Sequence, residues 1–303
     1  MKSGFITLIG RSNVGKSTLL NTIIGTKIAA VSHRPQTTRN VIHGVLNMPE
    51  GQAVFIDTPG VFKESKNPLA GKLEERVRES IQDIDLLIYV VDPSKSIGEE
   101  ERYMQSIMRK AKTPKILVIN KSDLTAKEKP YLEDYKNLDI EFDGVFELSA
   151  VKNRHVEPLR QKVMELLPEG EKIYEDGQIT NISSEFWLAE VIREKIMLAL
   201  RQEVPYSVHV EIEDIKEKPI SASAFVKAKS DREALADEGK NMLVIKAIIY
   251  TDNPKYKKMI IGAGGRAIKE IGIAARKEIE TALNKKIYLE LEVEKDKHWE
   301  ERV

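Results

Sequence analysis

The feature that most constrains this 303-residue chain is a glycine-rich loop at residues 10–17, which reads G-R-S-N-V-G-K-S. It matches the phosphate-binding pattern GxxxxGK(S/T) and lies between an apolar segment, 5–9, and a segment with helical periodicity, 17–24. In that setting backbone N–H groups wrap phosphates, and the helix N-terminus adds partial positive charge. A chance glycine turn is the alternative, and it arises in about one chain of this length per hundred. The loop therefore predicts a P-loop nucleotide-binding domain.

Short apolar runs alternate with helical patterns up to about residue 168. The predicted strands are 5–9, 54–56, 86–91, 116–119 and 145–148, and the predicted helices are 17–24, 72–81, 99–110, 126–136 and 156–167. This alternation predicts an α/β fold with a doubly wound, mostly parallel sheet over residues 1–168. Ligands of such sheets bind at the carboxyl ends of the strands.

The pattern changes after Pro168, and the chain length favours two domains. Residues 169–183 read as a linker. Residues 184–303 read as a smaller α+β domain with helices at 185–200, 254–261 and 266–283 and strands at 207–213, 222–229, 242–250 and 287–293.

Composition excludes several classes of protein. The chain has no cysteine, which rules out disulfides and thiolate metal sites, and its five histidines have no metal-ligand spacing. The 48 basic and 48 acidic residues balance, so bulk charge does not favour coating of nucleic acid, although a local basic patch is compatible. No apolar run reaches the roughly 18 residues of a membrane span, and the first residues do not read as a signal peptide. We expect a soluble, monomeric protein.

The P-loop and a downstream D-T-P-G, residues 57–60, assign roles around the phosphates. Lys16 is expected to reach the β and γ phosphates, while Ser17 and Asp57 hold Mg²⁺ and the Gly60 N–H contacts the γ-phosphate. Alone, D-x-x-G is usually a plain turn, but here it follows a predicted strand. The other expected nucleotide contacts in this region are Gly10, Asn13, Val14, Gly15 and Thr18.

The segment N-K-S-D at residues 120–123 is expected to select the base. A carboxylate at Asp123 only accepts hydrogen bonds, and guanine presents N1–H and an exocyclic amine side by side. Adenine offers neither there, so the carboxylate penalises ATP. We expect Asn120 to brace the loop, Lys121 to cover the base plane, and the backbone after residue 148, at Ser149 and Ala150, to face guanine O6. A capping asparagine with a surface aspartate is the alternative.

The loop G-A-G-G at residues 262–265 resembles the GxxG loop of a type II KH domain, which clamps about four nucleotides between two helices. From residue 246 to residue 286 there are ten basic and four acidic residues, which supports binding to phosphates. The expected RNA contacts are Lys257, Lys258, Ile261, Gly262, Ala263, Gly264, Gly265, Arg266, Ile268 and Lys269. The isoleucines fit a base groove and a core equally well.

Two other interpretations of this loop stay open. Residues 262–267 also fit the dinucleotide pattern GxGxxA, with Glu290 and Glu292 as the acids that follow. A KH-like scaffold that binds no RNA is the second. Ala263 stands where KH loops of the family described next usually carry a lysine, so one phosphate contact is absent.

Together these motifs resemble translation-factor-type GTPases, and the KH-like tail narrows the resemblance to the Era family of ribosome-assembly GTPases. The resemblance covers essentially the whole chain. It implies Mg²⁺-dependent hydrolysis of GTP to GDP and phosphate, with Lys16, Thr38 and Gly60 as the catalytic set. Thr38 is chosen over its neighbour Thr37 as the third Mg²⁺ ligand. A plain threonine-rich loop is the alternative.

The resemblance also implies a slow intrinsic rate, because Val61 stands where Ras-like proteins carry a water-orienting glutamine. Asn13 is expected to help seat K⁺. The expected partners are the single-stranded 3′ end of small-subunit rRNA and the small ribosomal subunit. The expected location is the cytoplasm, with a peripheral contact at the inner face of the cell membrane.

Two rival functions remain. One is a GTP-gated binding protein with negligible unstimulated turnover. The other is a membrane-associated signalling GTPase, with residues 185–200 as the contact.

Overall fold

The computed structural model describes residues 1–31, 41–57, 84–200, 204, 207–219 and 241–299. The chain divides into two compact units, Met1–Ile182 (unit 1) and Ser183–Val303 (unit 2). The predicted helix 72–81, the predicted strand 222–229, and the residues Thr37, Thr38, Gly60 and Val61 lie outside the described residues.

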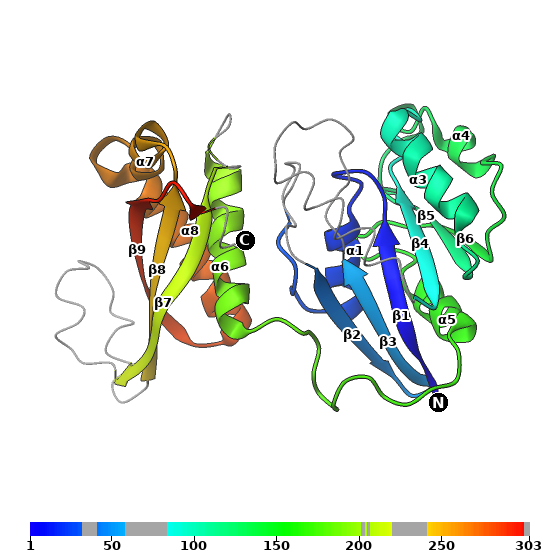
Figure 1. The fold of residues 1–303 in the computed structure, drawn as a ribbon, viewed down its shortest axis with the longest axis horizontal. Helices are drawn as coiled ribbons and strands as arrows, with labels where there is room; N and C mark the ends of the chain where they lie inside the picture. Colours follow the sequence, from blue (N-terminus) through cyan, green and yellow to red (C-terminus); the bar gives the residue numbers. More distant parts are fainter. Residues whose placement is uncertain (32–40, 58–83, 201–203, 205–206, 220–240, 300–303) are drawn as a thin grey trace. The chain divides into compact units, whose positions relative to one another are not determined.

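Unit 1 is built around a six-stranded sheet with the order β2-β3-β1-β4-β5-β6 (Figure 1). All neighbouring strands run parallel except β2 and β3, which are antiparallel. The strands are β1 (Lys2–Ile9), β2 (Ile42–Met48), β3 (Gly51–Asp57), β4 (Leu86–Val91), β5 (Lys115–Ile119) and β6 (Gly144–Glu147). The predicted doubly wound, mostly parallel sheet is confirmed.

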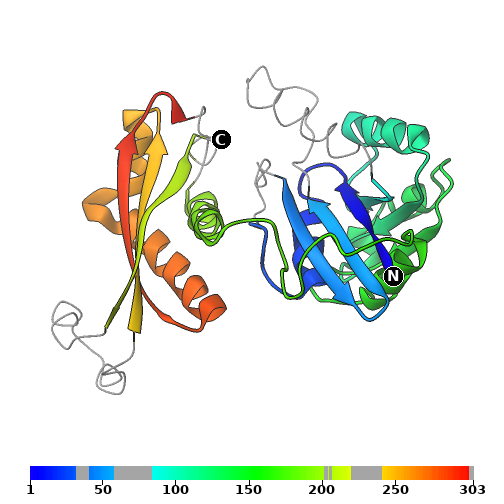
Figure 2. The same ribbon diagram turned by 60° about the horizontal axis from the view of Figure 1, so that its bottom comes forward.

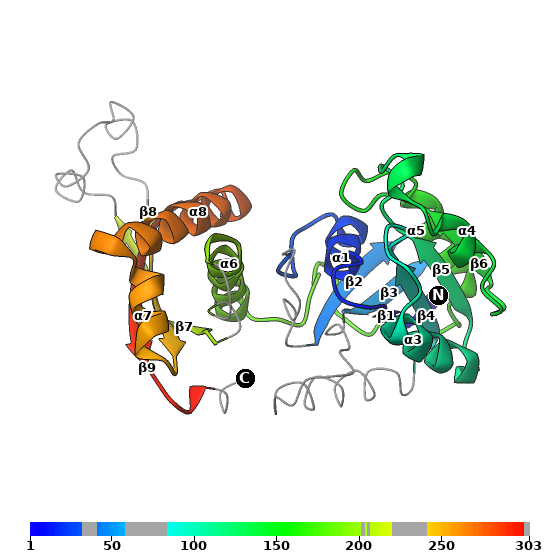
Figure 3. The ribbon, with the colours of Figure 1, turned by 90° about the horizontal axis from the view of Figure 1, so that it is seen from above.

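Helices cover both faces of this sheet, which is why β3 and β4 are buried at every position. Figure 3 shows α1 (Lys16–Ile24) and α5 (Glu157–Leu166) on one face and α3 (Glu99–Lys110) on the other. Side chains of α3 and of α4 (Leu132–Lys136) share one buried cluster with β4 and β5. Because the helices pack on the two faces of the sheet, the carboxyl ends of the strands are where ligands of such a fold bind.

Two elements of unit 1 differ from the sequence prediction. Strand β2 was not predicted, because His43, Gly44 and Asn47 interrupt its apolar alternation. The single helix predicted over 126–136 is wrong: a one-turn 3₁₀ helix, η1 (Ala126–Glu128), precedes α4. Pro130 lies between them, and since proline has no N–H it interrupts a helix.

Residues 169–183 are predicted as a linker, but in the structure they belong to compact unit 1 as far as Ile182. The buried Gln52 accepts hydrogen bonds from the N–H groups of Ile173 and Tyr174 at 2.9 and 2.8 Å. Further along, the Val45 N–H donates to the Ile179 carbonyl at 2.9 Å. The segment thus pairs with strand β2 and with residues of β3.

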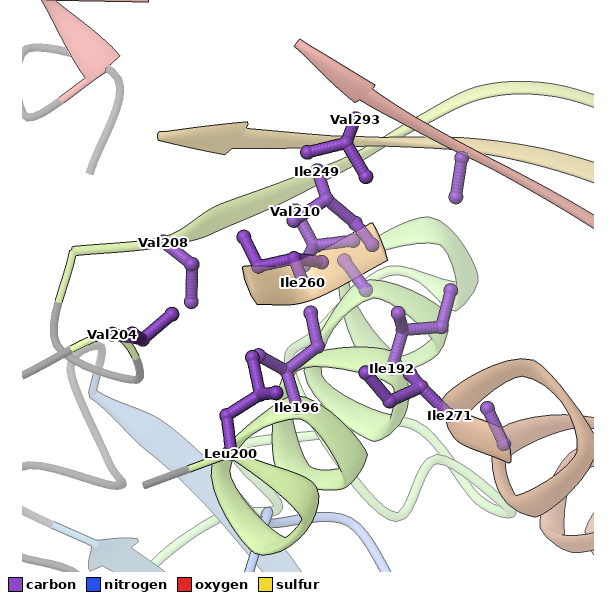
Figure 4. Close-up of a cluster of buried hydrophobic side chains, with 13 residues drawn as sticks. Ile192, Ile196, Leu200, Val204, Val208, Val210, Ile249, Ile260, Ile271 and Val293 are labelled. Atoms are coloured by element: carbon purple, nitrogen blue, oxygen red, sulfur yellow. The ribbon is translucent and has the colours of Figure 1, made fainter. Parts of the chain in front are cut away.

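The described residues of unit 2 form a three-stranded sheet, β7-β8-β9, with three helices on one face (Figures 2 and 4). β7 and β8 are antiparallel, and β8 and β9 are parallel. The elements are α6 (Ser184–Ala199), β7 (His209–Pro219), β8 (Asn241–Thr251), α7 (Pro254–Ile261), a one-turn 3₁₀ helix η5 (Ala263–Gly265), α8 (Arg266–Leu283) and β9 (Lys286–Lys295). The predicted KH-like order of helices and strands is confirmed.

The core of unit 2 explains the apolar character of the predicted helix 185–200. Ser183 caps α6 by accepting a hydrogen bond from the Phe186 N–H at 3.1 Å. Ile192 and Ile196 are fully buried against Ile249 of β8 and Ile271 of α8 (Figure 4). Most apolar residues of this helix therefore serve the core, and no helix of the described residues is long and apolar enough to cross a membrane.

Candidate nucleotide site and candidate RNA groove

The predicted phosphate loop joins β1 to α1, and its glycines have a structural reason. Gly15 has φ +101°, and a β-carbon there would lie 2.4 Å from Asn120 Nδ2. Gly10 approaches the Val90 carbonyl equally closely, with 2.3 Å from a β-carbon to that oxygen. Asn13 also has a positive φ, 64°, and is exposed, whereas Val14 is buried. Positions 10 and 15 therefore require glycine, because a β-carbon there would collide with Val90 or Asn120.

Lys16, the first residue of α1, folds back over this loop. Its Nζ donates to the carbonyls of Gly10 and Arg11 at 2.9 and 3.1 Å. Burial lowers the pKa of Lys16, while the carboxylates of Asp57 and Glu101 act in the opposite direction. A cation held inside a loop of backbone amides is suited to bind phosphate oxygens.

Two of the predicted Mg²⁺ ligands lie together beside the loop. The Ser17 hydroxyl donates to Asp57 Oδ2 at 2.6 Å, and Asp57 is fully buried at the end of β3. Hydroxyl and carboxylate oxygens are the ligands Mg²⁺ prefers, and its sites usually include substrate phosphates. These residues fit the ion; Thr38, the third predicted ligand, and Gly60 fall outside the described residues. Thr18, the other predicted contact in α1, is half-buried in the first turn.

Asn120, at the end of β5, connects the two nucleotide motifs. Its Nδ2 donates to the Val14 carbonyl at 2.8 Å, and its Oδ1 accepts the Ala150 N–H at 3.0 Å. The side chain is buried. In this structure the Ala150 N–H, which was expected to face guanine O6, therefore bonds to Asn120. The asparagine side chain therefore ties the P-loop to the segment at Ala150.

Lys121 and Asp123 are held by partners from neighbouring strand ends. Lys121 Nζ pairs with Asp92 Oδ2 at 2.5 Å. Burial would raise the pKa of Asp92, but hydrogen bonds from Lys121 and Ser94 outweigh it and keep the pKa below its usual value. The pairing holds the lysine stem in place, and Asp92 follows β4, where no motif pointed to it.

The Asp123 carboxylate receives a hydrogen bond from Ser149 at 2.5 Å between Oγ and Oδ1. That bond lowers the pKa of Asp123, so the group is an acceptor at neutral pH. Asp123 is exposed, so a ligand can reach its carboxylate. The arrangement suits a base that offers two adjacent N–H groups.

A buried acid behind the P-loop was missed by the sequence analysis. Glu101 of α3 is fully buried and accepts a hydrogen bond from the Tyr89 hydroxyl of β4. Burial raises the pKa of Glu101 and also that of Tyr89. Next to it, Glu100 pairs with Arg11 of the P-loop, with 3.0 Å from Oε2 to Nε. No motif marks these residues, because a tyrosine in a buried strand and glutamates in a first helical turn are ordinary.

The predicted GxxG loop joins α7 to α8 in unit 2. Gly262 has φ +74°, and a β-carbon there would lie 2.7 Å from the Ala267 β-carbon, so only glycine fits. Ala263 and Gly264 are exposed, as are the predicted contacts Lys258, Arg266 and Lys269, while Lys257 and Gly265 are half-buried. Ile261 and Ile268 are half-buried against the core, and Ile260 is entirely core.

A hollow of about 300 Å³ lies between α8 and β9, beyond the GxxG loop. Of the predicted RNA contacts, it includes only Ile268 and Lys269. Its other lining residues were not predicted from the sequence: Gly272, Ile273, Arg276, Tyr288, Leu289 and Leu291. They come from two elements separated by a turn, so no continuous motif contains them.

Two family models match the chain. One, described as a 50S ribosome-binding GTPase, covers residues 5–121, and the other, a KH domain, covers residues 227–300. Among curated proteins, the GTPase Era of Thermoanaerobacter sp. (strain X514) is 38% identical over 98% of this chain and 92% of that protein. The GTPase Era of Halothermothrix orenii is 40% identical over 99% of this chain and 95% of that protein.

Solved structures are similar over the whole chain. A crystal structure of Era in complex with MgGDPNP and nucleotides 1506–1542 of 16S ribosomal RNA has a TM-score of 0.85 and 33% identity, covering 100% of this chain and 96% of that one. A variant of Aquifex aeolicus Era bound to GDP and AlF₄⁻ has a TM-score of 0.84 and 34% identity, with the same coverage.

Proposed function

Because this chain belongs to the Era family of GTPases, we propose that it is a GTP-hydrolysing switch that binds the 3′ end of small-subunit rRNA and assists assembly of the small ribosomal subunit. The observation that carries this proposal is that one chain contains both features: a P-loop held by Asn120 beside a carboxylate acceptor in unit 1, and a GxxG loop in unit 2. A relative similar over the whole chain has been crystallised with both kinds of ligand.

The family model that matches residues 5–121 is described as a 50S ribosome-binding GTPase, which names the large ribosomal subunit. It covers the GTPase unit alone. We assign the partner from the whole-chain similarity, since that includes the RNA-binding unit.

We propose that the phosphates lie in the loop 10–17 with Lys16 on the β and γ oxygens, and that Ser17 and Asp57 hold Mg²⁺. The ion supplies charge neutralisation at the phosphates. Lys16 adds a second fixed cation, whose low-dielectric surroundings strengthen its attraction for developing negative charge. Thr38 and Gly60 stay predicted members of the catalytic set.

For base selection we propose that Asp123 accepts from guanine N1–H and the exocyclic amine, while Lys121 covers the ring. The bond from Ser149 fixes the carboxylate, and the bond from Asp92 fixes the lysine. Preorganised acceptors of this kind reject a base that lacks the donors.

Asn13 stays our proposal for a K⁺ contact that adds positive charge near the leaving oxygen. Its exposed position with φ 64° in the P-loop supports the proposal. Hydrolysis rates measured at equal ionic strength in KCl and NaCl test it, and equal rates contradict it.

We place the site of action in the cytoplasm, as befits a ribosome assembly factor. The helix considered for a membrane contact directs Ile192 and Ile196 into the core of unit 2, which removes the main support for lipid binding. Flotation with liposomes, with and without GTP, tests this assignment.

The proposed function is tested by measuring Mg²⁺-dependent GTP hydrolysis and RNA binding on the full chain. We expect slow release of phosphate from GTP and none from ATP, and loss of release in Lys16→Ala. We also expect tighter binding to the 3′-terminal segment of small-subunit rRNA than to a scrambled strand of the same composition. Hydrolysis that stays undetectable without a partner favours the GTP-gated binding protein, and equal binding of both RNAs contradicts the assigned RNA partner.

A further inference from the structure

We propose that Arg11 and Glu100 are positioning residues for GTP hydrolysis, which act through Lys16. Their ion pair fixes the first half of the P-loop, where backbone carbonyls hold the Lys16 ammonium group. Arg11 stands at a position where the pattern GxxxxGK(S/T) accepts any residue, and Glu100 lies outside every motif of the sequence. The inference rests on the proposed function and deepens it, because it concerns the same phosphate site.

The first step of the argument concerns the direction of the Lys16 side chain. Its Nζ donates to the Gly10 carbonyl at 2.9 Å and to the Arg11 carbonyl at 3.1 Å. A lysine side chain is a flexible four-carbon stem, so these two bonds decide where its charge lies. The position of the ammonium group therefore depends on the backbone of residues 10 and 11.

The second step concerns what holds that backbone. The second half of the loop is held by Asn120, whose Nδ2 donates to the Val14 carbonyl at 2.8 Å. In the first half, Arg11 Nε lies 3.0 Å from Glu100 Oε2, and the two side chains are only 29% and 27% exposed. Partly buried ion pairs are screened less by salt than exposed ones. The pair thus anchors the loop at the residue whose carbonyl holds Lys16.

The third step concerns the rigidity of the anchor. Glu100 lies in the first turn of α3, which the Arg102 N–H closes by donating to the Gly98 carbonyl at 3.0 Å. The next residue, Glu101, is fully buried and accepts a hydrogen bond from the Tyr89 hydroxyl of β4. This turn of α3 is therefore tied to the central sheet, and a residue on a rigid element positions its partner more precisely than one on a loop.

The consequence for the reaction follows from the chemistry of phosphoryl transfer, which depends on positioning and on stabilisation of charge. A displacement of about 1 Å can cost roughly 100-fold in rate. Since the Gly10 carbonyl would still hold Lys16, we expect loss of the ion pair to slow the chemical step by about tenfold. If the pair served stability alone, its loss would change any equilibrium by at most about fivefold.

The test measures single-turnover hydrolysis of GTP by the full chain with Mg²⁺, which separates the chemical step from product release. Binding of GDP and of a non-hydrolysable GTP analogue is measured in parallel. Arg11→Gln and Glu100→Gln are each expected to slow hydrolysis about tenfold. Both nucleotide affinities are expected to stay within about fivefold of wild type. Arg11→Lys retains a cation opposite Glu100 and is expected to recover most of the rate.

A double variant and a matched control complete the experiment. Arg11→Gln combined with Glu100→Gln is expected to be no slower than the slower single variant, because both substitutions remove the same interaction. The control is Glu99→Gln: Glu99 is exposed in the same turn of α3, and its substitution removes the same charge. The control is expected to hydrolyse GTP at the wild-type rate. Thermal unfolding checks that every variant folds.

Four outcomes overturn the inference. Unchanged hydrolysis in both single variants removes the positioning role, and losses that multiply in the double variant mean that the two residues act separately. An equal loss in Glu99→Gln means a general effect of charge on α3. A slower rate matched by equal losses of affinity for both nucleotides means a structural role. In each of these cases wild type still hydrolyses GTP and the proposed function stands, whereas undetectable hydrolysis by wild type contradicts both.

Discussion

The proposed nucleotide site of unit 1 and the proposed RNA site of unit 2 are built in opposite ways. In unit 1 the side chains that we propose select the base are each held by a partner within the unit: Asn120 by the P-loop, Lys121 by Asp92, and Asp123 by Ser149. In unit 2 Lys258, Arg266 and Lys269 beside the GxxG loop are exposed, and the Arg266 Nε donates to the Ala263 carbonyl at 3.3 Å.

This difference teaches where specificity resides. An acceptor that is held in place before binding loses its water without gaining a partner when a base that lacks the donors covers it, so it discriminates strongly and depends little on salt. A site of exposed cations and apolar surfaces gains from charge and stacking, so each single contact contributes less to its affinity, and its binding weakens as salt rises. Substitutions in the two regions should therefore have effects of different size and kind.

The largest effect is expected for Asp123→Asn, which replaces an acceptor by an amide. GTP affinity should fall by about 10³-fold or more and preference should shift to XTP, whose base offers an acceptor in place of the amine. Competition binding with GTP, XTP and ATP measures the change, and Asp134→Asn, on exposed α4, is the matched control. An unchanged preference for GTP over XTP would show that this carboxylate does not select the base, and it would contradict the contrast between the two units.

Asn120→Ala should have the second-largest effect. It removes two hydrogen bonds and leaves the Val14 carbonyl and the Ala150 N–H without this partner. At about 1–3 kcal/mol for each buried group, GTP affinity or stability should drop by roughly 100-fold or more. Titration calorimetry and thermal unfolding measure both quantities. Asn137→Ala removes one exposed bond, to the Glu133 carbonyl, and should change neither.

Ala263→Lys tests the comparison in unit 2. Residue 263 is exposed beside the RNA loop, so an added cation should contact one more phosphate. RNA affinity should rise several-fold, and the salt slope should steepen by about 0.7. GTP hydrolysis should not change. If affinity rose with no change in slope, the gain would have a source other than phosphate contact.

The smallest effect concerns the buried acid behind the P-loop. Because the pKa of Glu101 is raised by burial, the folded state holds a proton that the unfolded state releases first. Stability should therefore fall as pH rises above the usual glutamate value towards the raised one. Glu101→Gln mimics the protonated acid and should flatten that decline in thermal unfolding between pH 5 and 8. A variant that declines in parallel with wild type would show that Glu101 is ionised in the fold.

The sequence predicted most where chemistry demands fixed residues at fixed spacing. Gly15, Lys16 and Asn120 lie where their motifs indicate, because a phosphate loop and its brace tolerate few other side chains. Similarly, Gly262 marks the KH loop because no β-carbon fits beside Ala267.

Other parts escaped prediction for physical reasons. Strand β2 gains its stability from pairing with β3 and with the segment around Ile179, and its own residues carry a weak pattern. Asp92 and Glu101 depend on partners brought by the tertiary fold. The hollow between α8 and β9 is lined by residues of two separate elements, so no continuous stretch of sequence marks it.

The measurement that tests the central claim most directly is the affinity of the full chain for the small-subunit rRNA 3′ end, at fixed salt, with GDP and with a non-hydrolysable GTP analogue. If the two units form one switch, we expect affinities that differ by tenfold or more, about 1.4 kcal/mol of coupling. By linkage, the RNA should then change the ratio of the analogue and GDP affinities by the same factor. Equal RNA affinities in both nucleotide states would mean two independent binding units on one chain and would contradict the account.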